Sequence, residues 1–177
     1  MSRERLRECC RAVGTENVVV PYLGPSRFED EQSVARTSTA LSELGESLAA
    51  DGLRLHYHNH DQEFQRIDGE YALETLLARA DIGLELDTGW AAYAGADPAA
   101  LLERYDDRIS LVHVKDVDAA TGTATQLGEG CLDLDRLGAR LRASNVEWAI
   151  YEHDAPEDPL AAMAEGKRRL DERVLGR

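Results

Sequence analysis

The sequence predicts an α/β fold in which parallel strands alternate with helices, in about five βα units that open on a helix. Short apolar runs rich in β-branched residues recur along the chain, and a helix-like segment separates each run from the next. This alternation favours a parallel sheet with right-handed crossovers. A further observation concerns function, because four of the runs end in a histidine, an aspartate or a glutamate.

The first half of the chain shows the alternation clearly. In order, we expect a helix over residues 2–13, a strand over 17–23, a helix over 29–50 and a strand over 52–58. Gly14 is a suitable end for the first helix. The run NVVVPYL is continuously apolar, as a buried parallel strand should be. Leu41, Leu44 and Leu48 recur at helical spacing in the long second helix.

The second half continues in the same way. We expect helices over 71–80, 98–105, 134–143 and 158–175, and strands over 82–87, 109–113 and 147–152. Asp97 followed by Pro98 is typical of a helix N-terminus. The stretch 118–131 contains two glycine turns and is long enough to be a mobile loop beside a site.

The four strand-end side chains are His58, Asp87, His113 and Glu152, separated by 29, 26 and 39 positions. Because the carboxyl ends of parallel strands face one side of an α/β barrel, we expect these side chains to meet there. Two imidazoles and two carboxylates are a plausible ligand set for a divalent metal. A single strand-end histidine is more often structural, but four such residues in succession favour the metal site.

Composition and charge exclude some classes of protein. With 177 residues and 43% hydrophobic residues, the chain is long enough for one domain with a real core. It is short for an eight-unit barrel, which typically needs about 250 residues. The net charge of −14 argues against a nucleic-acid partner. So much acid also fits a halophilic protein, although an ordinary acidic cytosolic enzyme is the alternative.

Three further features predict a cytoplasmic location. The three cysteines, Cys9, Cys10 and Cys131, have no disulfide-framework spacing, which is typical of reduced thiols in a cytoplasm. No apolar run approaches the ~20 residues that span a bilayer, so we expect no membrane segment. The first ten residues are charged and lack the apolar core of a signal peptide.

An ordered set of motifs gives the chain a family resemblance. The motifs are YHNHDQEF (57–64), ELDTGW (85–90), HVKD (113–116), LGEGCLD (127–133) and YEHD (151–154). Together they resemble the sugar phosphate isomerase/epimerase family, the xylose-isomerase-like TIM barrels that also include the apurinic endonuclease (AP endonuclease 2) type. The resemblance covers essentially the whole chain and implies an incomplete barrel of the parallel (β/α) TIM type.

The resemblance also implies a site. It places one divalent metal ion, Mn, Co, Zn, Mg or Fe, on the same four residues that the spacing selects: His58, Asp87, His113 and Glu152. Around a sugar or keto-sugar substrate it places six more: Tyr57, His60, Glu63, Trp90, Lys115 and Asp116. Trp90 offers a flat wall for a sugar ring, and Lys115 can reach an anionic oxygen of the substrate. Glu63 and His60 have a plainer interpretation, as residues that order the loop after the second strand.

The chemistry that the resemblance implies is a metal-dependent isomerisation or epimerisation of a sugar, keto-sugar or sugar phosphate through an enediolate. Glu152 is the favoured base, with His60 or Glu63 on the opposite side of the substrate and Lys115 sharing the enediolate charge. Many epimerases of the family have a glutamate where this chain has His58. A dehydratase or lyase acting on a keto-sugar or inosose is therefore a comparably strong alternative. The endonuclease branch fits less well, because Trp90 stands where that branch has a histidine.

The resemblance further implies that residues 1–177 form a single barrel domain without its first three βα units. The strands at 17–23 and 147–152 would then be exposed edges. A homo-oligomer could cover them; alternatively, the start is assigned too late in the gene, or the chain is a remnant. A non-catalytic barrel fragment or a sugar-binding module is accordingly the third functional hypothesis.

Overall fold

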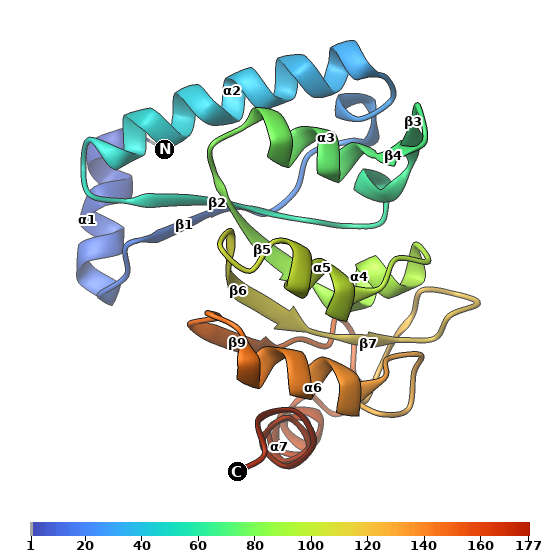
Figure 1. Ribbon diagram of the computed structural model, residues 1–177. Helices are drawn as coiled ribbons and strands as arrows, with labels where there is room; N and C mark the ends of the chain where they lie inside the picture. Colours follow the sequence, from blue (N-terminus) through green and yellow to red (C-terminus); the bar gives the residue numbers. More distant parts are fainter. Residues whose placement is uncertain (1) are drawn as a thin grey trace. The chain divides into compact units, whose positions relative to one another are not determined.

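The computed structural model describes residues 2–177, and its five parallel strands follow the hydrogen-bonded order β1-β2-β5-β6-β9 (Figure 1). They are β1 (Asn17–Val20), β2 (Arg54–His58), β5 (Gly83–Asp87), β6 (Ile109–Val114) and β9 (Trp148–Tyr151). Each strand is followed in the chain by at least one helix, which confirms the five βα units expected from the sequence. The chain divides into two compact units, which are described separately. The first unit consists of the residues up to His58 together with Gln65–Gly83, and the second unit consists of Asn59–Phe64 and Leu84–Arg177.

In the first unit, helices α2 and α3 pack against each other and β1 pairs with β2. The helices are α1 (Arg3–Val13), the short 3₁₀ helix η1 (Pro25–Arg27), α2 (Glu31–Ala49) and α3 (Ala72–Arg79), and a small hairpin joins β3 (Arg66–Ile67) to β4 (Glu70–Tyr71). The side chains of Ser2 and Asp30 cap α1 and α2, and Gly14 ends α1 with φ +73°. Val34 and Leu48 of α2 are buried with Leu73 and Leu76 of α3.

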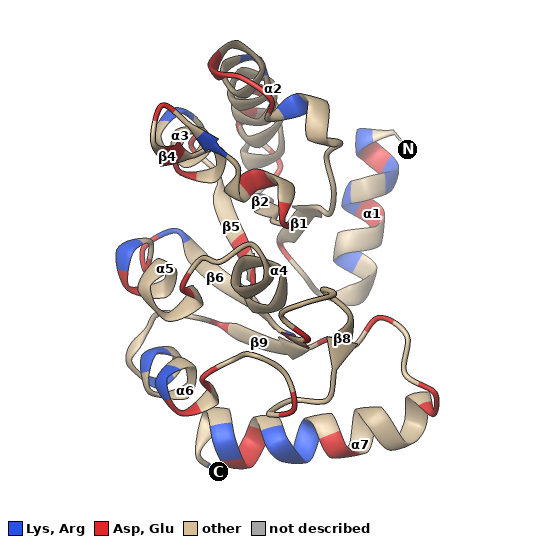
Figure 2. Ribbon diagram, turned by 90° about the vertical axis from the view of Figure 1, so that its right-hand side faces the viewer, with Lys and Arg blue, Asp and Glu red and all other residues tan. Residues whose placement is uncertain are grey.

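The second unit contains β5, β6 and β9, and their register sets the heights of the candidate ligands. Its helices are η2 (Gln62–Phe64), α4 (Thr88–Tyr93), α5 (Pro98–Arg104), α6 (Leu134–Ala143), α7 (Pro159–Arg169) and the π-helical turn η3 (Leu170–Leu175). Asp87 lies opposite His113, and His113 opposite Ile150. α6 packs on η3 and α5 packs on α6. Figure 2 shows basic residues gathered at the end of α7, where they complement the helix dipole.

Several boundaries differ from the sequence-based expectation. The strand expected over 17–23 ends at Val20, because Pro21 cannot donate to the ladder. The stretch expected to be irregular, 118–131, contains β8 (Ala124–Thr125), which pairs with β7 (Asp116–Val117). Helix α4 was not expected at all, and the last helix changes to a π-helix at Leu170. Among residues 2–177, no helix combines the length and apolar character that crossing a bilayer requires.

Candidate functional site

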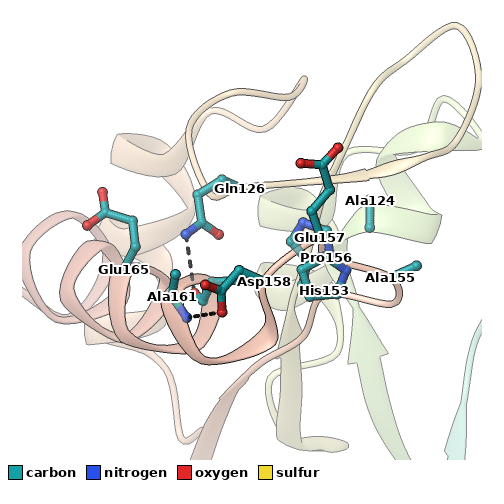
Figure 3. Close-up of a pocket in the computed structure, with 10 residues that line it drawn as sticks. Ala124, Gln126, His153, Ala155, Pro156, Glu157, Asp158, Ala161 and Glu165 are labelled. Atoms are coloured by element: carbon teal, nitrogen blue, oxygen red, sulfur yellow. Dashed lines mark hydrogen bonds between the residues drawn. The ribbon is translucent and has the colours of Figure 1, made fainter.

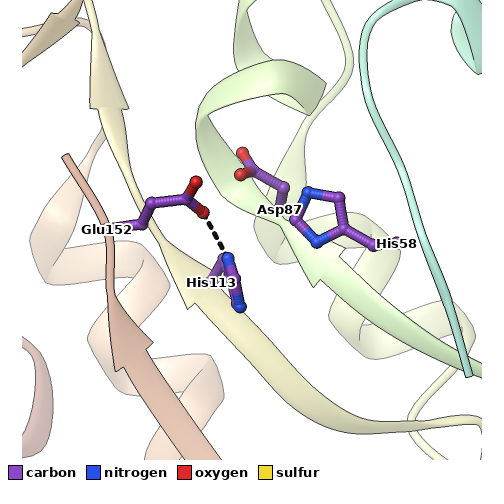
Figure 4. Close-up of side chains that lie close together, drawn as sticks. All are labelled: His58, Asp87, His113 and Glu152. Carbon is purple, nitrogen blue, oxygen red and sulfur yellow. Dashed lines mark hydrogen bonds and ion pairs between the residues drawn. The ribbon is translucent and has the colours of Figure 1, made fainter. Parts of the chain in front are cut away.

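Three of the four predicted ligands lie together in the second unit. Asp87 ends β5, His113 lies opposite it on β6, and Glu152 directly follows β9 and donates its N–H to Val114 O at 3.3 Å. One ligand atom from each of Asp87, His113 and Glu152 lies within 4.8 Å of the others. Figure 4 shows the carboxylates of Asp87 and Glu152 and the His113 imidazole converging from adjacent strands. Strand order and register thus explain the convergence.

The fourth predicted ligand, His58, is the last residue of β2 and of the first unit (Figure 4). It directly precedes Asn59, which belongs to the second unit and is fully buried. The Asn59 side chain binds the backbone of Asp87 twice: Nδ2 donates to Asp87 O at 3.2 Å, and Asp87 N donates to Oδ1 at 3.0 Å. The residue next to His58 in the chain is therefore anchored to a candidate ligand.

The imidazole of His113 lies between two carboxylates, those of Glu152 and Glu85. Its Nδ1 bonds to Glu152, and its Nε2 lies 3.4 Å from Glu85 Oε1. Burial lowers the pKa of His113, but the hydrogen bonds to Glu152 and Glu85 outweigh it and raise the pKa to about 10. A proton on this imidazole therefore supplies positive charge between carboxylates. Carboxylate and imidazole donors this close together fit a divalent cation, which would have to displace that proton.

Lys115 brings a second cation to the same carboxylates. Its side chain is 1% exposed, and Nζ lies 3.7 Å from Glu152 Oε1 and 3.9 Å from Asp87 Oδ2. The ammonium also lies 4.5 Å from the centre of the Trp90 ring, which is cation–π distance. The hydroxyl of Thr88, at the start of α4, accepts the Lys115 N–H at 3.1 Å and fixes this end of β6.

The loop after β2 brings His60 and Glu63 to the same side of the second unit. Glu63 is fully buried, and its Oε2 accepts the His60 N–H at 2.7 Å, so Glu63 orders the loop. The His60 ring stacks on Trp90 with a centroid distance of 5.6 Å, and Tyr93 meets Trp90 edge-on. The Trp90 ring is thus contacted by an imidazole, a phenol and the Lys115 ammonium.

The two remaining predicted substrate residues are buried. The Asp116 carboxylate accepts backbone N–H bonds from Val117, Gly128, Gly130 and Leu132, at 2.8–3.0 Å. Asp116 thereby ties the loop over 118–131 to the end of β6. Tyr57 is fully buried in β2 of the first unit, where its ring packs on Phe28. Their predicted contacts with substrate stay predictions.

Asp154 was missed by the sequence analysis. Its Oδ2 lies 2.6 Å from Lys115 Nζ, the shortest of the distances from this ammonium to a carboxylate oxygen among the described residues. The motif YEHD contains Asp154, but nothing in the sequence tells which distant side chain it contacts. Glu129, a carboxylate of the motif LGEGCLD, does not pair with Lys115 among the contacts described. It forms an ion pair with Arg169.

A separate cavity of about 440 Å³ lies between the segment after β9, the start of α7 and β8 (Figure 3). Its lining includes Ala124, Gln126, His153, Glu157 and Ala161. The Nδ1 atom of His153 is buried and has no hydrogen-bond partner in the described part of the chain. His153 thus lines this cavity, although it is adjacent in sequence to the ligand candidate Glu152.

Comparison with known proteins agrees with this architecture. The sequence model of the family described as xylose isomerase-like TIM barrel matches residues 3–173. A sugar phosphate isomerase/epimerase from Parabacteroides distasonis has a similar structure, with a TM-score of 0.81 and 22% identity, over 94% of this chain and 61% of that one. At this identity the similarity concerns the fold.

Two curated relatives have a higher sequence identity to this chain than that structure has. An inosose dehydratase from Geobacillus kaustophilus is 34% identical over 167 residues, covering 78% of this chain and 53% of that protein. An inosose dehydratase from Clostridium beijerinckii is 28% identical over 154 residues, covering 76% of this chain and 51% of that protein. The chain spans about half the length of these two relatives.

Proposed function

Because the chain belongs to the xylose isomerase-like TIM barrel family, an enzyme family, we propose that it carries the metal-dependent centre of a dehydratase acting on a cyclic keto-polyol of the inosose class. The observation that carries the proposal is the convergence of Asp87, His113 and Glu152 within 4.8 Å, beside the buried ammonium of Lys115. The two curated relatives named as inosose dehydratases support the substrate class and the reaction.

The proposed ligands are His58, Asp87, His113 and Glu152. Asn59 supports the inclusion of His58, because its amide is bonded to the Asp87 backbone and its peptide neighbour is His58. Two imidazoles with two carboxylates suit Mn²⁺, Fe²⁺, Co²⁺ or Zn²⁺. When bound, the metal would act as a Lewis acid on the ketone and hydroxyl oxygens of the substrate.

Side chains of this protein would then remove and donate the protons of a β-elimination. A base removes the C–H proton next to the ketone, and the electron pair forms an enolate. The hydroxyl on the next carbon leaves as water after it receives a proton, and an unsaturated ketone remains. We assign the base to Glu152 and the proton donor to His60. Lys115, with Nζ near Glu152 and Asp87, would donate a hydrogen bond to the enolate oxygen.

An isomerase or epimerase is the second candidate. It shares the first step, removal of a proton next to a carbonyl, but must return the proton to another position. The identity of His58 favours elimination, since an imidazole replaces the second carboxylate that a symmetric proton exchange would use. A non-catalytic sugar-binding chain is the third candidate, and it differs from both in lacking turnover.

The test combines metal content with an assay for the unsaturated ketone. We expect about one Mn, Fe, Co or Zn per chain, measured by elemental analysis of purified protein, and water loss from an inosose, followed by ultraviolet absorbance of the product. His113→Ala should lose both the metal and the activity, because it removes the central ligand.

His153→Ala is the matched control, since His153 is a histidine in the same region that lines the separate cavity. This variant should retain the wild-type metal content. Equal metal loss in both variants, or no metal in the wild type, would contradict the proposed centre. Metal binding with isomerised product would select the second candidate, and metal binding without turnover would select the third.

A further inference from the structure

We propose that Asp154 is a positioning residue: it keeps the Lys115 ammonium from moving into direct hydrogen bonds with Asp87 and Glu152, and thereby keeps these two carboxylates available to a divalent metal. The inference rests on the proposed function and adds a residue to it. It also assigns the buried lysine a second effect, as an internal competitor of the metal ion.

The distances support this assignment. Lys115 Nζ forms a close ion pair with Asp154 Oδ2 at 2.6 Å, but lies 3.7 Å from Glu152 Oε1 and 3.9 Å from Asp87 Oδ2. The ammonium is therefore close to both proposed ligands without a direct hydrogen bond to either of them. The Asp154 side chain is 46% exposed, so it approaches the buried ammonium from the solvent side.

Packing confines the rest of the lysine side chain. A Cβ added at Gly89 would lie 2.8 Å from Lys115 Cγ, so the stem of the lysine already touches the backbone of α4. Trp90 lies beside the ammonium at 4.5 Å. Since the stem of Lys115 is packed in this way, mainly its ammonium end can move. It can move toward Asp154 on one side, or toward Asp87 and Glu152 on the other. An ammonium this buried needs an anionic partner. Without Asp154 it would turn toward the proposed metal ligands.

A double-mutant cycle on metal affinity tests the proposal. Mn²⁺ binding would be measured by calorimetry for wild type, Asp154→Asn, Lys115→Met and the double variant. Asp154→Asn should weaken binding about tenfold, because the ammonium then occupies the carboxylates. In the Lys115→Met background the same change should alter affinity by less than about twofold. An equal loss in both backgrounds would overturn the proposal, since it would mean that Asp154 acts on the metal directly through its charge.

A second readout needs neither metal nor activity. Lys115 and Lys167 are the only lysines in the sequence, so protein labelled with ¹⁵N-lysine has two side-chain nitrogen signals. Lys167 pairs with Asp171 on the surface of the protein, which provides a matched control pair. Asp154→Asn should shift the Lys115 signal alone, and Asp171→Asn should shift the Lys167 signal alone and leave Mn²⁺ affinity unchanged.

The two proposals can fail separately. A wild-type chain that binds no Mn²⁺ would contradict the proposed function, while the ¹⁵N signals would still show whether Asp154 holds the ammonium. A Lys115 signal that does not respond to Asp154→Asn would overturn the positioning role, whatever the metal content.

Discussion

The amide of Asn59 is the residue-scale feature that fixes a candidate ligand most directly. It satisfies both the N–H and the C=O of Asp87 at a buried position, with distances of 3.0 and 3.2 Å. The Asp87 side chain is held in place as well, because its Oδ1 accepts the Trp90 N–H at 2.8 Å. This hydrogen bond caps the start of α4. Asp87 can therefore present its other carboxylate oxygen, Oδ2, in only a narrow range of directions.

Asn59→Ala should lower the free energy of unfolding by about 2 kcal/mol or more, because it removes two buried hydrogen bonds to the Asp87 backbone. Urea unfolding followed by circular dichroism would measure the change. Asn145→Ala is the matched control: that amide bonds to Asp106 at the surface, and its removal should cost less than about 0.5 kcal/mol. Similar losses in the two variants would contradict the importance of the Asn59–Asp87 pair.

At this scale, the sequence predicted some of the site and missed the rest for a physical reason. Asp87, His113 and Glu152 were predictable because they end strands, and strand ends of a parallel sheet converge. Asn59 and Asp154 act through contacts with residues far along the chain. Their partners depend on the loop after β2 and the segment after β9, for which the sequence has no periodic pattern.

At the scale of elements, the hairpin and loop after β6 are organised by a single side chain. Asp116 is fully buried and binds four backbone N–H groups, three of them from residues 128–132. Gly130 approaches Asp116 so closely that any side chain there would collide with the carboxylate and with Val117 O. The loop therefore requires both the aspartate and the glycine.

Gly130→Ala should destabilise the protein by about 1–3 kcal/mol, since the new methyl group must displace Asp116 or the loop. Thermal unfolding would detect this as a lower midpoint. Gly24→Ala serves as the comparison, because nothing lies within 4 Å of a Cβ at Gly24 and its φ of −63° suits alanine. Its expected effect is within about 0.5 kcal/mol of zero. A Gly130→Ala protein as stable as Gly24→Ala would show that the loop rearranges freely.

The sequence predicted helices correctly where the hydrophobic periodicity and the capping residue indicate the same helix end. Helix α6 covers the predicted residues 134–143, and Asp97 caps α5 as expected. It failed for α4, where Asp87 both ends a strand and caps a six-residue helix that is too short for a periodic pattern. It also failed for β7 and β8, since two-residue strands depend on the partner strand and the Asp116 contacts.

At the scale of the whole molecule, β9 is the last strand in the hydrogen-bonded order of residues 2–177 and carries exposed apolar side chains. Trp148 is 61% exposed and Ile150 is 36% exposed. The two share a face of the strand, because their positions differ by two. An apolar edge strand of this kind favours association. The homo-oligomer, which the sequence offers as one of several ways to cover the exposed edges, stays a prediction.

Trp148→Lys should reduce self-association, because a charged residue on an edge strand opposes further pairing. Light scattering over a concentration series would measure the mean mass of wild type and variant. Leu160→Lys is the control: Leu160 is 79% exposed but lies in helix α7 and not in a strand. A wild type that remains monomeric at all concentrations, or equal effects of the two changes, would refute this prediction.

The carboxylate of Asp116 also has a consequence for hydrogen exchange. The amides of Gly128, Gly130 and Leu132 lie outside any helix or strand, and amides of irregular segments usually exchange with solvent quickly. Here each donates to a buried acceptor, so release requires the local opening of the whole segment. These three amides should therefore be protected within an otherwise fast-exchanging loop, and their exchange should report one common free energy of opening.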